Sequence, residues 1–408
     1  MLAMSGAQDI IVIGAGVVGM ATALTLADRG HRVTVIDGAE GPGLGTSFAN
    51  GAQLSYAYTD ALASPGVLGE LPRLALGRDP AFRLRLHLDP DFLRWGLAFL
   101  RNCAIDRFQR NTIAGLALAA RARDALEELT QRHALDYAQA MPGKIHLYRS
   151  AAALSGAERM AALKARYGVR QEVLDPDATV AHEPALAPIR HDIAGALHTA
   201  GEAVGDPHLF CTEAAAALRR LGGTLRFGTR VARIVEDGAT PAIILTTGER
   251  IGADRVVLAA ATGSVALARS LGVRLPIQPV KGYSITAPIG AATPHASITD
   301  AANRVVFARL GDRVRIAGLA DLGARDTTVD GKRLAALIAS ARAALPGAAD
   351  YGRIEMRWAG LRPMTPNSLP ITRAIAPGVI ANCGHGALGW TWAAGSAREV
   401  ADLIGGRT

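Results

Sequence analysis

The chain has 408 residues, half of them hydrophobic and 20% charged, which is too long for one small domain and predicts two domains with a large core. The formal net charge of +8 is compatible with an anionic ligand, an anionic membrane or nucleic acid. The positive residues are mostly arginines scattered along the chain, so we expect no nucleic-acid partner. Two interpretations of the charge stay open: a basic soluble enzyme, or an enzyme in peripheral contact with an anionic membrane.

No targeting or membrane-spanning segment is expected. Residues 1–8 lack a basic cluster followed by an apolar stretch, which a signal peptide would have. Cys103, Cys211 and Cys383 show no paired spacing, so we expect a reducing compartment without a disulfide framework. These features predict a cytoplasmic protein, either free or attached peripherally to the inner face of the cytoplasmic membrane. No cluster of ligating residues indicates a metal site.

The most informative stretch is 10–37, IIVIGAGVVGMATALTLADRGHRVTVID, which predicts a strand, a glycine-rich turn, a helix and a second strand ending at Asp37. Here Gly14 permits a tight turn, Gly16 lets the backbone approach a pyrophosphate, and Gly19 lets the helix pack on the strand. The unpaired N–H groups at the start of the helix favour an anion. Asp37 lies 18 residues after Gly19, which suits a bond to a ribose hydroxyl. The stretch therefore predicts dinucleotide binding.

Each part of this N-terminal region has an alternative interpretation. Residues 10–27 carry no charge, as in a membrane span, but 18 residues are few for a span and several are Gly or Thr. The glycine-rich loop 38–45 and the following TSFANG segment suit a loop laid along a diphosphate, with Ser47 and Asn50 as hydrogen-bond donors. A simple surface loop is the alternative for that segment.

The remainder of the chain mixes helical and strand patterns. Helical patterns occupy 90–135, 153–167, 206–222 and 330–345, a short helix lies in the loop 175–185, and a last helix begins in 383–390. Strand patterns occupy 143–148, 224–227, 230–236, 242–246, 256–261, 277–286, 304–310, 313–318 and 378–381. This order predicts an α/β fold, α+β overall, in which a Rossmann-like domain is interleaved with a smaller antiparallel-sheet domain.

Several motifs together resemble one known family. GAGVVG with VID, TSFANGAQLS, ASPGV, LRNC, KGYS, GLRPMTP and GHGALGWTWAAGS follow one another in the order typical of the D-amino acid oxidase-like (DAO) family of FAD-dependent enzymes. Within that family the chain is most similar to the bacterial D-amino acid dehydrogenases. The similarity covers nearly the whole chain, and GLRPMTP with GHGALGW is much more specific than the glycine-rich turn alone.

The resemblance implies FAD as the cofactor and a division of the chain into five parts. Residues 1–85, 191–272 and 353–408 are expected to form the FAD-binding domain, and 86–190 and 273–352 mainly the substrate domain. The family pattern places the following residues at the cofactor: Gly14, Ala15, Gly16, Val17, Val18, Gly19, Asp37, Gly38, Thr46, Ser47, Asn50, Gly51, Ala52, Val231, Ala261, Gly384, His385, Gly386, Ala387, Leu388 and Gly389. Val231 matches the position whose backbone meets the adenine ring.

The same resemblance assigns substrate roles. Arg362, in Gly360-Leu361-Arg362-Pro363, matches the arginine that holds the carboxylate of an amino acid, and a planar fork of donors suits that group. Tyr283 is expected to form a hydrogen bond with the carboxylate or to cover it. The alternative is that Tyr283 packs at the edge of the hydrophobic core, as amphipathic side chains often do. Tyr56 and Tyr58 are weaker candidates for a lid.

The segment 384–389 matches the family segment that lies against the pyrimidine edge of the flavin, where its N–H groups would favour the negative charge of the reduced ring. His385 is expected either to contact flavin or substrate, or to cap the helix. One position departs from the family pattern: Ala261 stands where relatives usually have glycine, which puts the local backbone path in question.

These assignments predict an FAD-dependent enzyme that converts D-amino acids to 2-oxo acids and ammonia by hydride transfer from Cα to flavin N5. The electrons would pass to a quinone or another carrier. Two alternatives stay open. One is the same chemistry on D-hydroxyproline, D-proline, glycine or sarcosine. The other is a flavin-carrying subunit of a larger electron-transfer assembly that is inactive alone.

Overall fold

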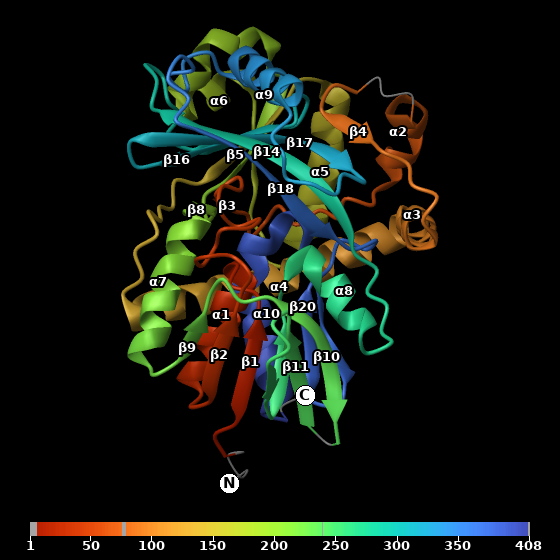
Figure 1. The fold of residues 1–408 in the computed structure, drawn as a ribbon. Coiled ribbons are helices and arrows are strands. Elements are labelled where there is room, and N and C mark those ends of the chain that lie inside the picture. The colour runs from red at the N-terminus through yellow and green to blue at the C-terminus, as the bar shows by residue number, and fades with distance from the viewer. Residues whose placement is uncertain (1–5, 76–78, 239, 407–408) are drawn as a thin grey trace.

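A six-stranded sheet forms the half of the molecule that carries both chain ends (Figure 1), in a computed structural model that describes residues 6–75, 79–238 and 240–406. Its central unit is β1 (Asp9–Ile13), α1 (Val17–Asp28) and β2 (Arg32–Ile36), with β1 and β2 parallel. The strand order is β19-β20-β13-β1-β2-β9, the outer members being β19 (Ile371–Ala376), β20 (Val379–Cys383), β13 (Arg255–Leu258) and β9 (Thr224–Arg226).

Four helices share a core with this sheet, because their buried faces meet the apolar residues of β1 and β2. They are α1, α4 (Ile105–His133), α7 (Pro207–Arg220) and α10 (Gly389–Ile404). A three-stranded sheet of β10 (Val231–Asp237), β11 (Thr240–Leu245) and β12 (Arg250–Gly252) adds a second small core with β13. Beside that core lies α8 (Ser264–Arg269).

The other half is built on a nine-stranded, largely antiparallel sheet, drawn above the first in Figure 1. Its order is β18 (Met356–Met364), β14 (Gln278–Pro288), β17 (Arg313–Leu322), β16 (Val305–Leu310), β15 (Ser297–Asp300), β5 (Lys144–Tyr148), β7 (Gly195–Thr199) and β6 (Glu172–Leu174), with β4 (Phe82–Leu84) paired to β17. One face packs on α9 (Gly331–Ala344). The opposite face is turned toward the dinucleotide-binding half.

The remaining elements lie outside the three sheets described above. They are β3 (Gln53–Leu54) paired with β8 (Ala203–Val204), α2 (Pro65–Ala75), α3 (Pro90–Asn102), α5 (Ala151–Ala165), α6 (Pro176–His182) and the 3₁₀ segments η1 (Pro184–Asp192), η2 (Ala261–Gly263) and η3 (Gly386–Leu388). None of the described helices combines the length and the apolar composition needed to cross a bilayer. The three cysteines are buried and unpaired.

The predicted fold class is confirmed, but several predicted boundaries differ from the observed sheets. Three strands of the substrate sheet, β4, β7 and β18, fall in ranges assigned to the FAD-binding domain. Conversely, α4 packs in the core of the dinucleotide-binding half. The helical pattern 90–135 is in fact two helices, because the chain turns at Cys103 and Ala104. Amphipathic periodicity shows which side of an element is apolar, and it does not show which core that side joins.

Ala261 keeps the backbone path that a glycine would take. Its φ is +49°, in the left-handed region where a Cβ is strained. We therefore expect Ala261→Gly to raise the free energy of unfolding by about 1 kcal/mol or less, because strain is relieved while some unfolded-state entropy is lost. Thermal or denaturant unfolding measures the change.

The neighbouring residue supplies the matched control. Ala260 has φ −85°, so Ala260→Gly relieves no strain and is expected to lower stability. Equal effects of the two substitutions would show that Ala261 carries no backbone strain.

Candidate active site

The glycine-rich turn after β1 can be built only without side chains at two positions. Gly14 has φ +111°, and a Cβ there would lie 2.5 Å from the carbonyl oxygen of Ala259 on the neighbouring strand segment. A Cβ on Gly19 would lie 1.8 Å from the carbonyl oxygen of Gly14. Gly16 differs from both. A Cβ on Gly16 would have only the Ser47 hydroxyl near it, at 3.2 Å, and the residue borders a cavity. The turn thus packs closely while exposing the start of α1.

Two side chains organise the backbone around this turn. The Ser47 hydroxyl accepts a hydrogen bond from the Val17 N–H at the first turn of α1 (3.1 Å). The Asp37 carboxylate accepts bonds from the Ala15 N–H (2.6 Å) and the Ala39 N–H (2.8 Å). Asp37 therefore holds the two loops together, and its expected bond to a ribose stays a prediction. Nearby, the Arg230 side chain lies against Gly38, 2.8 Å from where a Cβ would be.

A cavity of about 460 Å³ lies between the turn and the nine-stranded sheet. It brings together segments that are far apart in sequence. Of the predicted site residues, it is lined by Gly16, Val17, Val18, Thr46, Ser47, Asn50, Gly51, Ala52, Ala261, Tyr283, Arg362 and the whole of 384–389. The other predicted site residues do not line this cavity, although the structure describes them: Gly14, Ala15, Gly19, Asp37, Gly38, Val231 and Tyr56. Apart from Tyr56, these belong to the turn, the loop after β2 or the start of β10.

The segment 384–389 forms the glycine-rich wall of this cavity. Gly384 (φ +78°) and Gly386 (φ +58°) are left-handed, and Cβ atoms there would lie 2.7 Å from Thr365 Cγ2 and 2.8 Å from Met364 Sδ. As predicted, the last helix begins here, with α10 starting at Gly389. Bare peptide groups therefore border the cavity, and together with Gly16 and Ser47 they fit an extended dinucleotide with a planar ring. The glycine-rich turn and Ser47 would hold the diphosphate of FAD, and the segment 384–389 its flavin ring.

Arg362 projects from β18 into the same cavity and reaches across two neighbouring strands. Its Nη1 donates a hydrogen bond to the Leu319 carbonyl on β17 (3.0 Å). The guanidinium crosses β14 at Gly282, where a Cβ would lie only 2.3 Å from Nη2. Within the described chain, no carboxylate lies within ion-pair distance of Arg362. A half-buried guanidinium without an anion has the donors and the charge to bind a ligand carboxylate.

Leu319 is the residue that turns this carbonyl toward Arg362. Its φ is +58°, which is unusual for leucine and strained by about 1–2 kcal/mol. The pairing of β14 with β17 is irregular at the same place, between Lys281 and Tyr283. Backbone strain of this kind concentrates where a functional group must be aimed.

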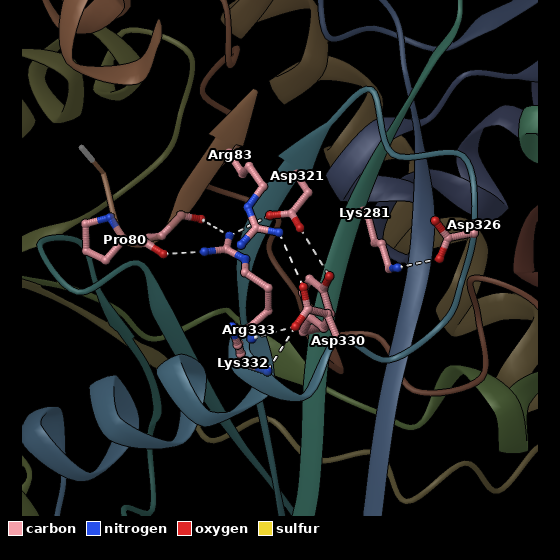
Figure 2. Close-up of polar contacts among 10 residues, drawn as sticks. Pro80, Arg83, Lys281, Asp321, Asp326, Asp330, Lys332 and Arg333 are labelled. Atoms are coloured by element: carbon pink, nitrogen blue, oxygen red, sulfur yellow. Dashed lines mark hydrogen bonds and ion pairs between the residues drawn. The ribbon is translucent and has the colours of Figure 1, made fainter. Parts of the chain in front are cut away.

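Tyr283 does not offer its hydroxyl to this cavity. It donates a hydrogen bond to Asp321 Oδ2 (3.1 Å), and the other Asp321 oxygen accepts from Arg333 of α9. Figure 2 shows this Asp321–Arg333 pair and the separate Lys281–Asp326 pair. These contacts match the predicted position of Tyr283 at the edge of the core, and its expected bond to a substrate carboxylate stays a prediction. Because side chains alternate along a strand, the Gly282 position that Arg362 needs turns Tyr283 toward α9.

His385 is buried and bonded within the protein. Its Nε2 is 2.8 Å from the Ser396 hydroxyl of α10, and burial lowers the pKa of the imidazole to about 3. The ring is therefore neutral at physiological pH. Its backbone also pairs with Met364, two residues after Arg362. The ring ties the glycine-rich segment to α10 without capping that helix, whose N-cap is Leu388, and the expected contact of His385 with flavin or substrate stays a prediction.

Tyr56, another predicted catalytic residue, does not line the cavity. Its ring packs against the core shared by α1, α4 and α10. Tyr58, two residues later, lines the cavity and stacks on His146 with ring centroids 3.9 Å apart. Sequence reasoning missed Lys144 and Trp358, which also line the cavity. The alternation of polar and apolar residues in Lys144–Tyr148 was the available signal, because it places Lys144 and His146 on one face.

A second, larger cavity of about 1080 Å³ adjoins the first. Both are lined by Tyr58, Leu62, Arg304, Arg362 and Leu388, so the two spaces meet beside the arginine. The larger one is mainly apolar, and its walls come from α2, β4, α3 and α5. Its lining residues include Val67, Leu71, Leu74, Phe82, Leu84, Phe92, Trp95, Phe99, Phe108 and Met160.

Comparison with known proteins identifies relatives along the whole chain. Residues 9–403 match the family described as FAD dependent oxidoreductase, DAO. A D-amino acid dehydrogenase of Paramagnetospirillum magneticum is 42% identical over 98% of this chain and 96% of its own. D-amino acid dehydrogenase 2 of Ralstonia nicotianae is 41% identical over 98% and 97%.

Solved structures match the fold at lower identity. Glycine oxidase from Geobacillus kaustophilus superposes with a TM-score of 0.75 at 23% identity, covering 99% of this chain and 96% of that one. An L-α-glycerophosphate oxidase from Mycoplasma pneumoniae with FAD bound has a TM-score of 0.76 at 16% identity, covering 98% and 95%. At these identities the likeness concerns the fold.

The geometry of the turn predicts that Gly19→Ala abolishes FAD retention. The new Cβ would meet backbone at 1.8 Å, so α1 must shift away from the diphosphate position. The ratio of flavin to protein absorbance in the purified variant measures the loss.

The control substitution is Gly69→Ala in α2, where nothing lies within 4 Å of the added atom. This variant should keep its flavin. A Gly19→Ala protein with a full complement of FAD would contradict the assignment of this turn.

Proposed function

The chain belongs to the DAO family of FAD-dependent oxidoreductases, and we propose that it oxidises D-amino acids to 2-oxo acids and ammonia. The observation that carries the proposal is Arg362, a guanidinium without a carboxylate partner beside the glycine-rich segment 384–389. The choice of D-amino acids follows the two relatives that are about 40% identical over 98% of the chain.

The residues of the chain would act by binding and orienting the substrate. Arg362 grips the α-carboxylate in two places, which fixes the rotation of Cα. Bound FAD supplies the acceptor for the hydride that leaves Cα. The neutral amine is the reactive form, so the amine must lose its proton on or before binding. The resulting imino acid departs and is hydrolysed to the 2-oxo acid and ammonia. Positioning and electrostatics then supply most of the catalysis.

For the electron acceptor, the proposal is a quinone that enters from a membrane through the larger cavity. The elements α2, β4 and α3 form part of the wall of this cavity, and they lie along one side of the molecule (Figure 1). This side exposes leucines to an unusual degree: Leu62, Leu86, Leu88, Leu93, Leu97 and Leu100 are 40–95% exposed. Arg101, Arg107 and Arg110 are exposed next to them. An apolar rim with flanking arginines suits an anionic bilayer surface.

The Arg362 assignment predicts that Arg362→Ala loses at least about 100-fold in kcat/KM for D-amino acids. Two hydrogen bonds to a charged group are worth about 1.5–3 kcal/mol each, and about 1.4 kcal/mol corresponds to tenfold. The measurement is anaerobic bleaching of the flavin absorbance by a panel of D- and L-amino acids and secondary amines.

Two further variants separate this role from a folding defect. Arg357→Ala removes an exposed arginine from the same strand and should leave the rate unchanged. Gly282→Ala should keep the bound flavin but raise KM, because its Cβ displaces the Arg362 side chain. Bleaching by D-amino acids in Arg362→Ala at the wild-type rate would overturn the assignment. Bleaching by secondary amines alone would favour the proline-type alternative, and no bleaching by any amine would favour a flavin-carrying subunit.

The proposed membrane contact predicts that the protein co-sediments with vesicles containing phosphatidylglycerol. The double variant Leu93→Glu/Leu97→Glu places two carboxylates on the exposed face of α3 and should abolish binding. The matched control is Leu209→Glu/Leu221→Glu, which alters two leucines of similar exposure at α7 on the other half. Equal loss in both variants, or no binding by the wild type, would exclude this surface.

A further inference from the structure

Lys144 lines the 460 Å³ cavity together with Arg362, from a different strand of the nine-stranded sheet. It is the first residue of β5, is only 3% exposed, and lines the cavity. Its register partner is Ser297 on β15, and that of Arg362 is Val280 on β14. Both side chains leave the sheet on the face that is turned toward the dinucleotide-binding half. The cavity is therefore lined by cationic side chains from two separate strands, Arg362 from β18 and Lys144 from β5.

The contacts of Lys144 differ from those of the two other buried lysines. Lys164 holds Asp60 at 2.7 Å and Lys281 holds Asp326 at 2.8 Å. Within the part of the chain that the structure describes, no carboxylate lies within 4 Å of the Lys144 ammonium. Its Nζ donates to the Ser55 hydroxyl (2.6 Å) and lies 5.3 Å from the centre of the Tyr58 ring. An ammonium has three donors, so this group has bonding capacity left for a ligand.

Glu202 acts on Lys144 only through space, because no hydrogen bond or ion pair joins them in the described chain. Its Oε1 accepts a hydrogen bond from the Ala57 N–H (2.6 Å), and burial raises the pKa of its carboxyl group. Burial lowers the pKa of Lys144 to about 8, so the ammonium stays largely protonated at neutral pH. A buried cation without an ion-pair partner is costly, and an anionic ligand relieves that cost.

The spacing between the two cations follows from the sheet. The Arg362 guanidinium reaches the Leu319 carbonyl on β17. Gln53, two residues before Ser55, bonds to Ser297 on β15 and to Phe307 on β16. In the strand order, β17 lies three inter-strand spacings from β5, the strand of Lys144, which is about 14 Å between the two backbones. A five-carbon dicarboxylate with a hydrogen bond of about 2.8 Å at each end bridges a gap of that order.

We propose that this enzyme prefers acidic D-amino acids, with the α-carboxylate on Arg362 and the side-chain carboxylate on Lys144 and Ser55. The inference rests on the proposed function and adds a substrate class to it. Tyr58 forms the wall that holds the ammonium in place, because Lys144 and His146 both lie against its ring.

The test compares each acidic substrate with its own amide, which has the same shape without the charge. Anaerobic flavin reduction is measured with D-glutamate, D-glutamine, D-aspartate and D-asparagine in the wild type and in Lys144→Met. We expect the wild type to prefer the acid over the amide by about 10-fold or more, the worth of one hydrogen bond to a charged group. Lys144→Met should lose that preference while reducing its flavin with the amides at about the wild-type rate. Lys144→Arg should retain it.

Lys281→Met is the matched control, because Lys281 is equally buried but lies on the opposite face of the sheet. It should keep the acid-to-amide preference. The inference is overturned if the wild type treats acids and amides alike, or if Lys144→Met slows all four substrates equally. In either case activity on neutral D-amino acids would leave the proposed function standing. If no D-amino acid reduces the flavin, the proposed function fails, and the inference fails with it.

Discussion

The hydrogen bond from Arg362 to the Leu319 carbonyl can form only if particular residues on the neighbouring strands β14 and β17 adopt an unusual geometry or lack a side chain. Gly282 must lack a side chain, because the guanidinium lies where its Cβ would be. Leu319 must adopt a left-handed backbone to aim its carbonyl. No acid of the described chain lies close enough to neutralise the charge. Each condition costs stability, and together they leave a cation that is available to an anionic ligand.

The strand that carries Arg362 is also tied to the cofactor side of the cavity. The Thr46 hydroxyl donates to the Leu361 carbonyl (2.8 Å), and the Met364 backbone pairs with His385. The Trp95 indole donates to the Met364 carbonyl from α3 (2.9 Å), next to the larger cavity. One short strand thus connects the loop that would follow the diphosphate, the wall that would face the flavin and the entrance proposed for the acceptor. Small displacements of β18 would change all three distances together.

Much of this arrangement was predictable from local patterns in the sequence. The turn at Gly14, Gly16 and Gly19 was predictable because a tight turn and close packing require glycine at this spacing, and these requirements act within a few residues. The fold class followed from the order of the helix and strand patterns, FAD followed from the family resemblance, and both are confirmed. The residues Gly16, Ser47 and 384–389 meet around one cavity as expected, although their contacts with a cofactor stay predictions.

The surroundings of several side chains could not be predicted from the sequence. They depend on which face of the sheet a residue occupies and on packing between segments that are distant in the sequence. Tyr283 follows Gly282, and only the register of β14 shows that its hydroxyl goes to Asp321. Tyr56 and Tyr58 point to different surroundings although they lie two residues apart in an irregular segment. That no carboxylate of the described residues lies within 4 Å of the Lys144 ammonium is a property of the folded chain, since 36 acids are spread through the sequence.

The most direct test of the central claim is to measure how strongly Arg362 discriminates between a carboxylate and an amide. The rate of anaerobic flavin reduction is compared for the best D-amino acid and its α-carboxamide, in the wild type and in Arg362→Ala. If Arg362 holds the α-carboxylate, the wild type strongly prefers the acid, and the variant reduces its flavin with both compounds at similar low rates. If the preference survives in Arg362→Ala, another group binds the carboxylate and this account of the site is wrong.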